Sequence, residues 1–211
     1  QQIFILEDAA YRELRYDGPE LPSIWSFDPD RRTVILANTF SKTFSPGLRV
    51  GFGVVPAELE RPICDRKGNE DFGSANFNQH LLSEVFRMGL YDSHVAGLRT
   101  MYRRKRDVML RAADAYFGEL PGVSWVQPHG GLYVWMTLPD HCDTSLGGRL
   151  FREATQSHGV MYVPGEFSFA GKPGDRPKNH MRLSYGVQDE AGIDLGMQRL
   201  ATAVRNVLAE I

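Results

Sequence analysis

One lysine, Lys42, stands in a stretch of sequence whose residue types could do chemistry. It lies within residues 38–49, NTFSKTFSPGLR, between two apolar runs at 34–37 and 50–55. Each run is short, apolar and β-branched enough to be a buried strand. We therefore expect Lys42 beside the end of a core strand, where desolvation would favour the neutral, nucleophilic amine.

The same stretch carries groups that bind phosphate. Four hydroxyl side chains surround Lys42 and precede a Pro-Gly turn, and Arg49 follows that turn. Hydroxyl groups and an Arg guanidinium donate the hydrogen bonds that hold phosphate oxygens. A nucleophilic amine beside a phosphate site suggests a Schiff base between Lys42 and pyridoxal phosphate.

A carboxylate follows an earlier expected strand. Residues 3–6 are apolar, Glu7 and Asp8 come next, and Tyr11 follows Asp8 by three residues. A carboxylate at the carboxyl end of a strand lies where open α/β sheets present ligand-binding groups. From the residues alone, Asp8 could be a surface turn residue, and Lys42 could be a surface lysine.

The rest of the chain alternates between helical and strand patterns. In the first half, we expect a loop over 15–32 around a helical turn at 24–27, a helix from Pro56 to 59, a loop over 65–73, and helices over 74–88 and 93–117. In the second half, we expect strands over 123–126, 131–138, 160–163 and 180–185, helices over 146–158 and from about 189, and a loop over 164–178. Alternation in the 180–185 strand puts Met181 and Leu183 on one face and Arg182 on the other. The Gly130-Gly131 pair allows a close backbone approach or a positive φ.

These patterns place a domain boundary near residue 95. Before it, strands alternate with helices, as in a parallel sheet. After it, long helices accompany a few strands, which is an α+β pattern. We therefore expect two parts, residues 1–95 and 96–211.

Composition and charge exclude several classes of function. The formal net charge of −2 offers no general attraction for nucleic acid or an anionic membrane. The basic run at 103–106 is expected to be the solvated face of a helix rather than a nucleic-acid patch. No apolar run approaches the roughly 20 residues that cross a bilayer, and the first residues lack the basic segment of a signal peptide. The cytoplasm is the default compartment.

The cysteines and histidines indicate no metal site. Cys64 and Cys142 are far apart in the sequence and lack metal-type spacing, so we expect unpaired thiols. The six histidines form no HxxxH group, and we expect no zinc.

Taken together, these motifs resemble the fold-type I aminotransferases (class I/II), and most closely the 2-aminoadipate and kynurenine aminotransferase subgroup. The matching pieces are residues 6–14 (LEDAAYREL), 39–51 (TFSKTFSPGLRVG), 128–135 (PHGGLYVW), 163–165 (VPG) and 181–185 (MRLSY). The block around Lys42 is highly specific. The chain departs from the subgroup at Ala9, where a second Asp is frequent, and at Phe44, where Leu is frequent.

The resemblance implies a role for each candidate residue. Lys42 would carry pyridoxal 5'-phosphate as a Schiff base and then act as general acid and base. Asp8 would pair with the pyridine nitrogen, and Tyr11 would hydrogen-bond the phenolic oxygen. The phosphate would be held by Arg49 together with a hydroxyl from one of two residues, Thr39 or Ser41.

The resemblance also implies how the substrate is held. Arg182 would take the substrate α-carboxylate in a bidentate fork, which a Lys could not reproduce. Tyr133 would form a wall of the substrate pocket. The substrates would be an amino acid and a 2-oxo acid.

The resemblance implies an α/β fold that is the C-terminal half of such an enzyme. Residues 1–95 would be part of an aspartate aminotransferase-like large domain with a mainly parallel sheet, and residues 96–211 the small α+β domain. Family members are about twice as long as this chain. We expect these 211 residues alone to transaminate poorly or not at all, and the family form to be a homodimer.

Two other functions remain open. Transcription regulators of the MocR/GntR type fuse a DNA-binding domain to this same fold, so the chain could be their effector-binding module. In that case, nucleic acid would be contacted by the upstream domain. A carbon–sulfur lyase would use the same residues. Ser45, which is typical of the 2-aminoadipate subgroup, favours the aminotransferase.

Overall fold

A computed structural model describes residues 3–209, which divide into two compact units. Unit 1 consists of residues 3–100 with 129–131, and unit 2 of residues 101–128 with 132–209. The boundary expected near residue 95 falls within the long helix α3 (Leu90–Phe117), which contributes residues to both units. The assignment of the two parts as a cofactor-binding domain and a small domain stays a prediction.

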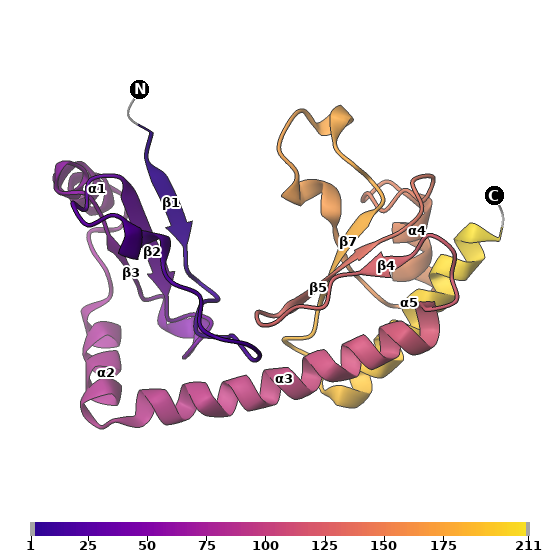
Figure 1. Cartoon of the computed structure of the whole chain (residues 1–211), viewed down its shortest axis with the longest axis horizontal. Coiled ribbons are helices and arrows are strands. Elements are labelled where there is room, and N and C mark those ends of the chain that lie inside the picture. The colour runs from indigo at the N-terminus through magenta and orange to yellow at the C-terminus, as the bar shows by residue number, and fades with distance from the viewer. Residues whose placement is uncertain (1–2, 210–211) are drawn as a thin grey trace. The chain divides into compact units, whose positions relative to one another are not determined.

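Unit 1 is built on a three-stranded sheet with the order β1-β2-β3 (Figure 1). Strands β1 (Ile5–Asp8) and β2 (Val34–Thr39) are parallel, and Asp8 lies opposite Ala37. Strand β3 (Gly51–Val54) is antiparallel to β2, so the pairs within this sheet are mixed. Since helices follow the strands in the same unit, the α/β class predicted from the sequence is confirmed.

The helices of unit 1 follow the sheet in the chain. They are α1 (Ala57–Asp71), α2 (Asn76–Arg87) and the first part of α3, with short 3-10 turns at Ile24–Phe27 and Pro46–Leu48. The turn at 24–27 was predicted. The loop predicted over 65–73 is wrong, because α1 continues to Asp71. Its second half carries ion pairs between residues four apart, such as Arg66–Glu70 and Lys67–Asp71, and such pairs support helix.

The strand predicted over residues 50–55 is present as β3, but the prediction that it is buried is wrong. Gly51 and Gly53 are exposed, and the Phe52 side chain is 46% exposed. The physical reason is position: β3 is an edge strand of the described sheet, paired with β2 on one side. Val34 at the start of β2 is buried, as expected for its run.

Unit 2 is an antiparallel sheet with helices, which matches the predicted α+β pattern. The sheet order is β4-β5-β7-β6, formed by β4 (Ser124–Trp125), β5 (Tyr133–Thr137), β6 (Val163–Pro164) and β7 (His180–Ser184). The helices are the second part of α3, α4 (Arg149–Arg152) continuing as a π-helical turn at Glu153–Ser157, and α5 (Glu190–Leu208); 3-10 turns lie at Gly165–Ser168 and Pro173–Asp175. The strand predicted over 160–163 has the wrong bounds: of that range only Val163 is paired with β7, together with Pro164.

The core of unit 2 follows the periodicity of the sequence. Met181 and Leu183 of β7 are buried, and so are Val134 and Met136 of its neighbour β5. The predicted apolar side of α5 is buried at Ile193, Met197, Leu200, Val204 and Val207. The predicted alternation in residues 180–185 is therefore confirmed, and it leaves Arg182 on the opposite, half-buried face.

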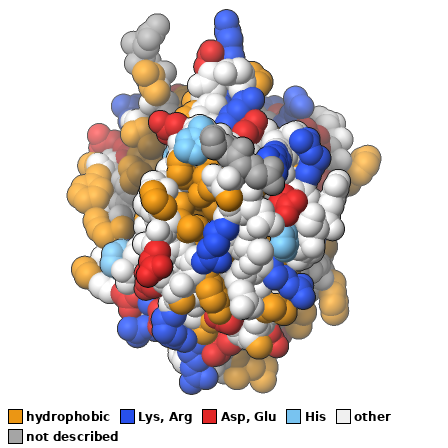
Figure 2. Space-filling view, turned by 90° about the vertical axis from the view of Figure 1, so that its right-hand side faces the viewer, with side chains coloured by type: hydrophobic (Ala, Val, Ile, Leu, Met, Phe, Trp, Pro, Cys, Tyr) orange, Lys and Arg blue, Asp and Glu red, His pale blue; other side chains and the backbone are white. Residues whose placement is uncertain are grey.

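The basic run on α3 is only partly a solvated face. Arg103 and Arg104 are exposed, but Arg106 is 3% exposed, which corrects the prediction for that residue. Its Nη1 donates to the carbonyl oxygen of Pro128 at 3.0 Å and its Nη2 to Asp107 Oδ1 at 2.6 Å. These partners satisfy the buried guanidinium. On the face that Figure 2 shows, basic and acidic side chains are interspersed.

Candidate active site

The stretch around Lys42 is a compact, internally bonded loop between β2 and β3. The Phe40 amide donates to Val50 O at 3.0 Å, and the Phe44 amide donates to Phe40 O at 2.8 Å. Farther along, Asn78 Nδ2 on α2 donates to Leu48 O at 2.9 Å. The backbone on both sides of Lys42 is thus fixed by hydrogen bonds within unit 1.

The predicted phosphate-binding side chains lie together at one end of this loop. Thr39 Oγ1 is 3.0 Å from Ser41 Oγ, and Arg49 Nη1 donates to the same Ser41 Oγ at 3.4 Å. Arg49 has a φ of 53°, a left-handed conformation that is uncommon for a non-glycine residue. With this backbone, its guanidinium also reaches Pro46 O at 3.2 Å. The loop therefore gathers two hydroxyls and one guanidinium, a set of donors suited to an oxyanion.

Lys42 itself is half-buried and faces an aromatic ring. Its Nζ lies 5.6 Å from the centroid of the Tyr11 ring. Among the described residues, it has no hydrogen-bond or ion-pair partner. The amine is therefore not committed to a carboxylate, and Tyr11 is the predicted site residue that it meets.

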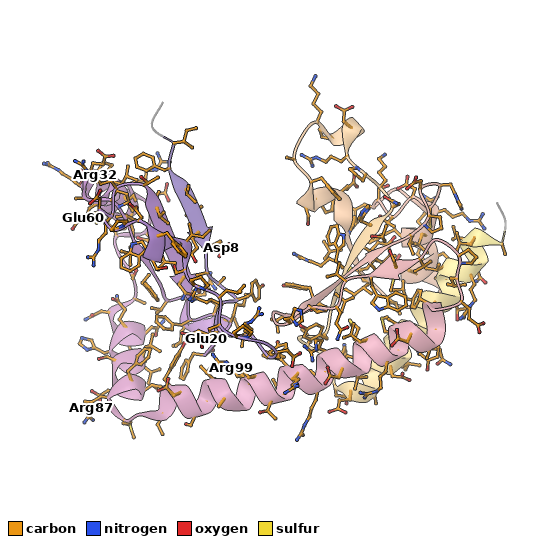
Figure 3. All side chains as sticks on the ribbon, in the orientation of Figure 1. Asp8, Glu20, Arg32, Glu60, Arg87 and Arg99 are labelled. Atoms are coloured by element: carbon orange, nitrogen blue, oxygen red, sulfur yellow. The ribbon has the colours of Figure 1, made fainter. Side chains whose placement is uncertain are left out.

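Asp8 ends β1 in the same unit (Figure 3). Because β1 and β2 are parallel, their carboxyl ends lie at the same edge of the sheet, and the Lys42 loop begins at that edge. The Asp8 side chain is exposed, and its Oδ1 accepts a hydrogen bond from the Ala10 amide at 3.1 Å. Within the described part of the chain it forms no ion pair, so its carboxylate can accept a further donor.

The sequence did not reveal a buried polar network directly behind Lys42. The hydroxyl of Tyr91, on α3, lies 2.8 Å from Thr43 Oγ1 and 2.5 Å from Glu13 Oε2. Burial raises the pKa of Tyr91, and the hydrogen bond to Glu13 raises it further. The position of Thr43 directly after Lys42 was a signal that its side chain could support the site. Nothing in the sequence indicates that Thr43 forms a hydrogen bond with Tyr91.

The predicted close approach at Gly130-Gly131 is confirmed. A Cβ at Gly130 would lie 2.4 Å from the Leu14 carbonyl oxygen, and Gly131 has a φ of 79°. The Tyr16 hydroxyl donates to Gly131 O. These contacts hold the 129–131 segment against the turn that follows Tyr11.

In unit 2, Arg182 and Tyr133 contact each other. The Arg182 Cζ lies 4.3 Å from the centroid of the Tyr133 ring, a cation–π stack between β7 and β5. Arg182 Nε is buried without a hydrogen-bond partner among the described residues. A stacked guanidinium with an unsatisfied donor is suited to a carboxylate ligand.

An aromatic group lies beside Arg182 on the same face of the sheet. The rings of Trp135, Phe169 and His180 lie with centroids 5.1–5.9 Å apart. Burial lowers the pKa of His180, which favours the neutral imidazole. Arg182 therefore has apolar and neutral neighbours on this side.

The structure brings six predicted site residues into unit 1 and two into unit 2. Those in unit 1 are Asp8, Tyr11, Thr39, Ser41, Lys42 and Arg49; those in unit 2 are Tyr133 and Arg182. Their chemical roles stay predictions. Over residues 3–209, no cluster of His, Cys, Asp or Glu side chains could hold a metal ion. None of the helices described is long and apolar enough to cross a membrane.

Comparison with known proteins identifies relatives over nearly the whole chain. The family model for aminotransferase class I and II matches residues 1–200. The aromatic-amino-acid aminotransferase 1 of Thermococcus litoralis is 35% identical over 201 residues, covering 95% of this chain and 46% of that protein. The solved alpha-aminoadipate aminotransferase of Thermus thermophilus, complexed with N-(5'-phosphopyridoxyl)-L-leucine, has a TM-score of 0.87 and 34% identity; 99% of this chain and 51% of that chain are covered.

The matches also include transcription regulators. The HTH-type transcriptional regulator NorG of Staphylococcus aureus is 28% identical over 203 residues, covering 96% of this chain and 43% of that protein. The chain spans about half the length of the curated relatives it matches. The resemblance read from the motifs is confirmed, and pyridoxal 5'-phosphate is the cofactor of that family. This chain belongs to the aminotransferase class I and II family.

Proposed function

We propose that this chain binds pyridoxal 5'-phosphate through Lys42 and serves transamination between an amino acid and a 2-oxo acid. The observation that carries the proposal is the uncommitted Lys42 amine, held in a bonded loop beside a cluster of oxyanion donors. When bound, the cofactor supplies an electron sink for the carbanion formed at the substrate Cα. The chain's own residues supply binding, orientation and proton transfer.

The residues present in unit 1 fit this cofactor. Arg49 would hold the phosphate with Thr39 and Ser41, which the structure gathers at one end of the loop. Asp8, a carboxylate without an ion-pair partner among the described residues, would accept a hydrogen bond from the protonated pyridine nitrogen and keep it protonated. Tyr11, beside Lys42, would donate to the phenolic oxygen.

Lys42 has two tasks in this proposal. Its Nζ would hold the cofactor before the substrate arrives. With cofactor and substrate bound, the same Nζ would act as the general base that takes the proton from the substrate Cα and then as the general acid that gives it back. The bonded loop keeps this amine in place for the second task, because both neighbouring backbone segments are fixed.

Arg182 would hold the substrate by its α-carboxylate. Its guanidinium offers parallel donors, and its buried Nε lacks a partner among the described residues. Tyr133 would support the guanidinium by stacking on it and would line the pocket. As the resemblance implies, we propose that the substrates are an amino acid and a 2-oxo acid and that the protein acts as a homodimer. We also propose that it acts in the cytoplasm, the default compartment.

A matched pair of lysine variants tests this function. In the polypeptide that carries this chain, Lys42→Ala should abolish amino-group transfer to a 2-oxo acid. Lys172→Ala changes an exposed lysine at the start of a 3-10 turn and should retain wild-type transfer. Transfer that survives in Lys42→Ala would refute the proposal.

The second candidate function is the effector-binding module of a transcription regulator. It is favoured by the match to the NorG regulator over 96% of the chain. Such a module would use the same cofactor residues without needing turnover. Cofactor binding without transfer to any 2-oxo acid, together with binding of the polypeptide to specific DNA, would favour this candidate over the enzyme.

A further inference from the structure

The residue after Lys42 is anchored from the opposite side of the loop. Lys42 is half-buried, with its amine near the Tyr11 ring, whereas Thr43 is 2% exposed. The Thr43 side chain therefore points into unit 1. Its only described hydrogen-bond partner is the hydroxyl of Tyr91, at 2.8 Å.

The chemistry of the three groups fixes the direction of the hydrogen bonds. A carboxylate oxygen only accepts hydrogen bonds, and Tyr91 has a single hydroxyl proton. Tyr91 therefore donates to Glu13 Oε2 at 2.5 Å, and the Thr43 hydroxyl donates to the Tyr91 oxygen at 2.8 Å. Tyr91 is 6% exposed, so water cannot readily replace either partner.

The network joins the two stretches that carry the candidate cofactor residues. Glu13 lies two residues after Tyr11, on the segment that begins with Asp8. This segment is tied to α3 a second time, because Arg99 Nε donates to Glu13 O at 2.6 Å; Arg99 is labelled in Figure 3. Thr43 connects the other stretch, through its peptide bond, to Lys42.

The Tyr91 ring is held as firmly as its hydroxyl. Its centroid lies 4.5 Å from that of Phe86 and 6.0 Å from that of Phe40, which precedes Lys42 by two residues. Aromatic pairs at these separations add packing energy beyond the area that they bury. The ring can therefore remain in place when the hydroxyl alone is removed.

We propose that Tyr91 is a positioning residue, whose hydroxyl sets the placement of Lys42 against the segment carrying Asp8 and Tyr11 by bonding Thr43 and Glu13 together. This inference rests on the proposed function of Lys42. Tyr91 does not touch the reacting atoms. Its effect is on the position of the Lys42 amine.

The test compares two Tyr→Phe variants on one helix. Tyr91→Phe keeps the ring and loses the hydroxyl. Tyr102→Phe, also on α3, is the matched control, because its hydroxyl has no hydrogen-bond partner among the described residues. We expect Tyr91→Phe to lower kcat about tenfold with KM unchanged, the cost of a displaced catalytic group. It should also shift the midpoint of the pH titration of the bound cofactor's absorbance, and Tyr102→Phe should do neither.

A second pair covers the case in which Tyr91→Phe does not fold. Thr43→Ser retains the hydroxyl and should behave as wild type, whereas Thr43→Val should reproduce both effects of Tyr91→Phe. If Tyr91→Phe or Thr43→Val lowers only thermal stability and leaves kcat and the titration midpoint unchanged, the inference is overturned. If the unsubstituted protein carries no cofactor on Lys42, the proposed function fails and the inference falls with it. A loaded, active protein whose Tyr91→Phe variant matches Tyr102→Phe would overturn the inference alone.

Discussion

Replacing Gly165 by alanine should destabilise unit 2, because the backbone of β7 occupies the space that the new methyl group needs. A Cβ at Gly165 would lie 2.4 Å from His180 Cβ and 2.8 Å from both the carbonyl carbon and the carbonyl oxygen of His180. Ordinary contact begins at 3.4 Å, so one of the two segments must move by about 1 Å. Two of the three atoms are backbone, and rotation of a side chain cannot relieve those contacts.

The size of the effect follows from this geometry. Overpacking of a filled site costs about 1–3 kcal/mol, and the rigid backbone neighbours place Gly165→Ala in the upper part of that range. The matched control is Gly174→Ala, since no atom outside Gly174 and its two chain neighbours lies within 4 Å of the Cβ position there. The control should leave the free energy of unfolding unchanged or raise it slightly.

Urea titration of both variants provides the measurement. Trp135 contacts the His180 ring, so its fluorescence reports on this part of unit 2. Gly165→Ala should lower the urea midpoint, and the thermal unfolding midpoint should fall by about 2–4 °C for each kcal/mol lost. A Gly165→Ala midpoint equal to that of wild type, or an equal loss in Gly174→Ala, would refute this packing argument.

Three further predictions concern other parts of the chain. Asp189 Oδ1 accepts from the Gly192 amide at 2.8 Å as the N-cap of α5, so Asp189→Ala should cost about 1 kcal/mol in urea titration and Asp189→Asn much less. Arg182→Lys should raise the KM for the amino acid about tenfold or more in steady-state kinetics, because a lysine cannot form the bidentate fork; an equal rise in the exposed control Arg199→Lys would contradict this. Burial raises the pKa of Cys142 to about 11. Because the unfolded thiol loses its proton at lower pH, the free energy of unfolding should fall as pH rises from about 9 to about 11. Cys142→Ala should reduce that fall, and an unchanged pH dependence would contradict the assignment.

Elements with strong periodicity could be predicted from the sequence. The buried side of α5 and the alternation in β7 appear where expected, since their apolar residues repeat at helix and strand spacing. The turn at 24–27 was also found from local composition. In each case, the signal and the structure it specifies lie within a few residues of each other.

The wrong predictions have two causes. In one case, a hydrogen-bond partner far away in the sequence determines whether a residue is buried. In the other, the composition of a segment was given more weight than the spacing of its charged residues. Arg106 is buried because Pro128 O and Asp107 accept from it, which a run of four basic residues does not indicate. The end of α1 was missed because its polar residues suggested a loop, although their spacing of four supports helix.

The residues of the candidate site also divide into those that the sequence groups and one that only the fold brings to them. Lys42, Thr39, Ser41 and Arg49 lie in one short stretch, and the sequence was sufficient to group them. Tyr91 could not be assigned to this site, since it is 48 residues from the Thr43 that it contacts. Contacts of this range require the fold.

The most direct test of the account is to locate the covalent cofactor. The polypeptide that carries this chain, loaded with pyridoxal 5'-phosphate and reduced with borohydride, would be digested and its labelled peptide identified by mass spectrometry. The account predicts one labelled residue, Lys42, and no label in Lys42→Ala. Label on another lysine, or no label in a protein that transfers amino groups, would contradict the central claim.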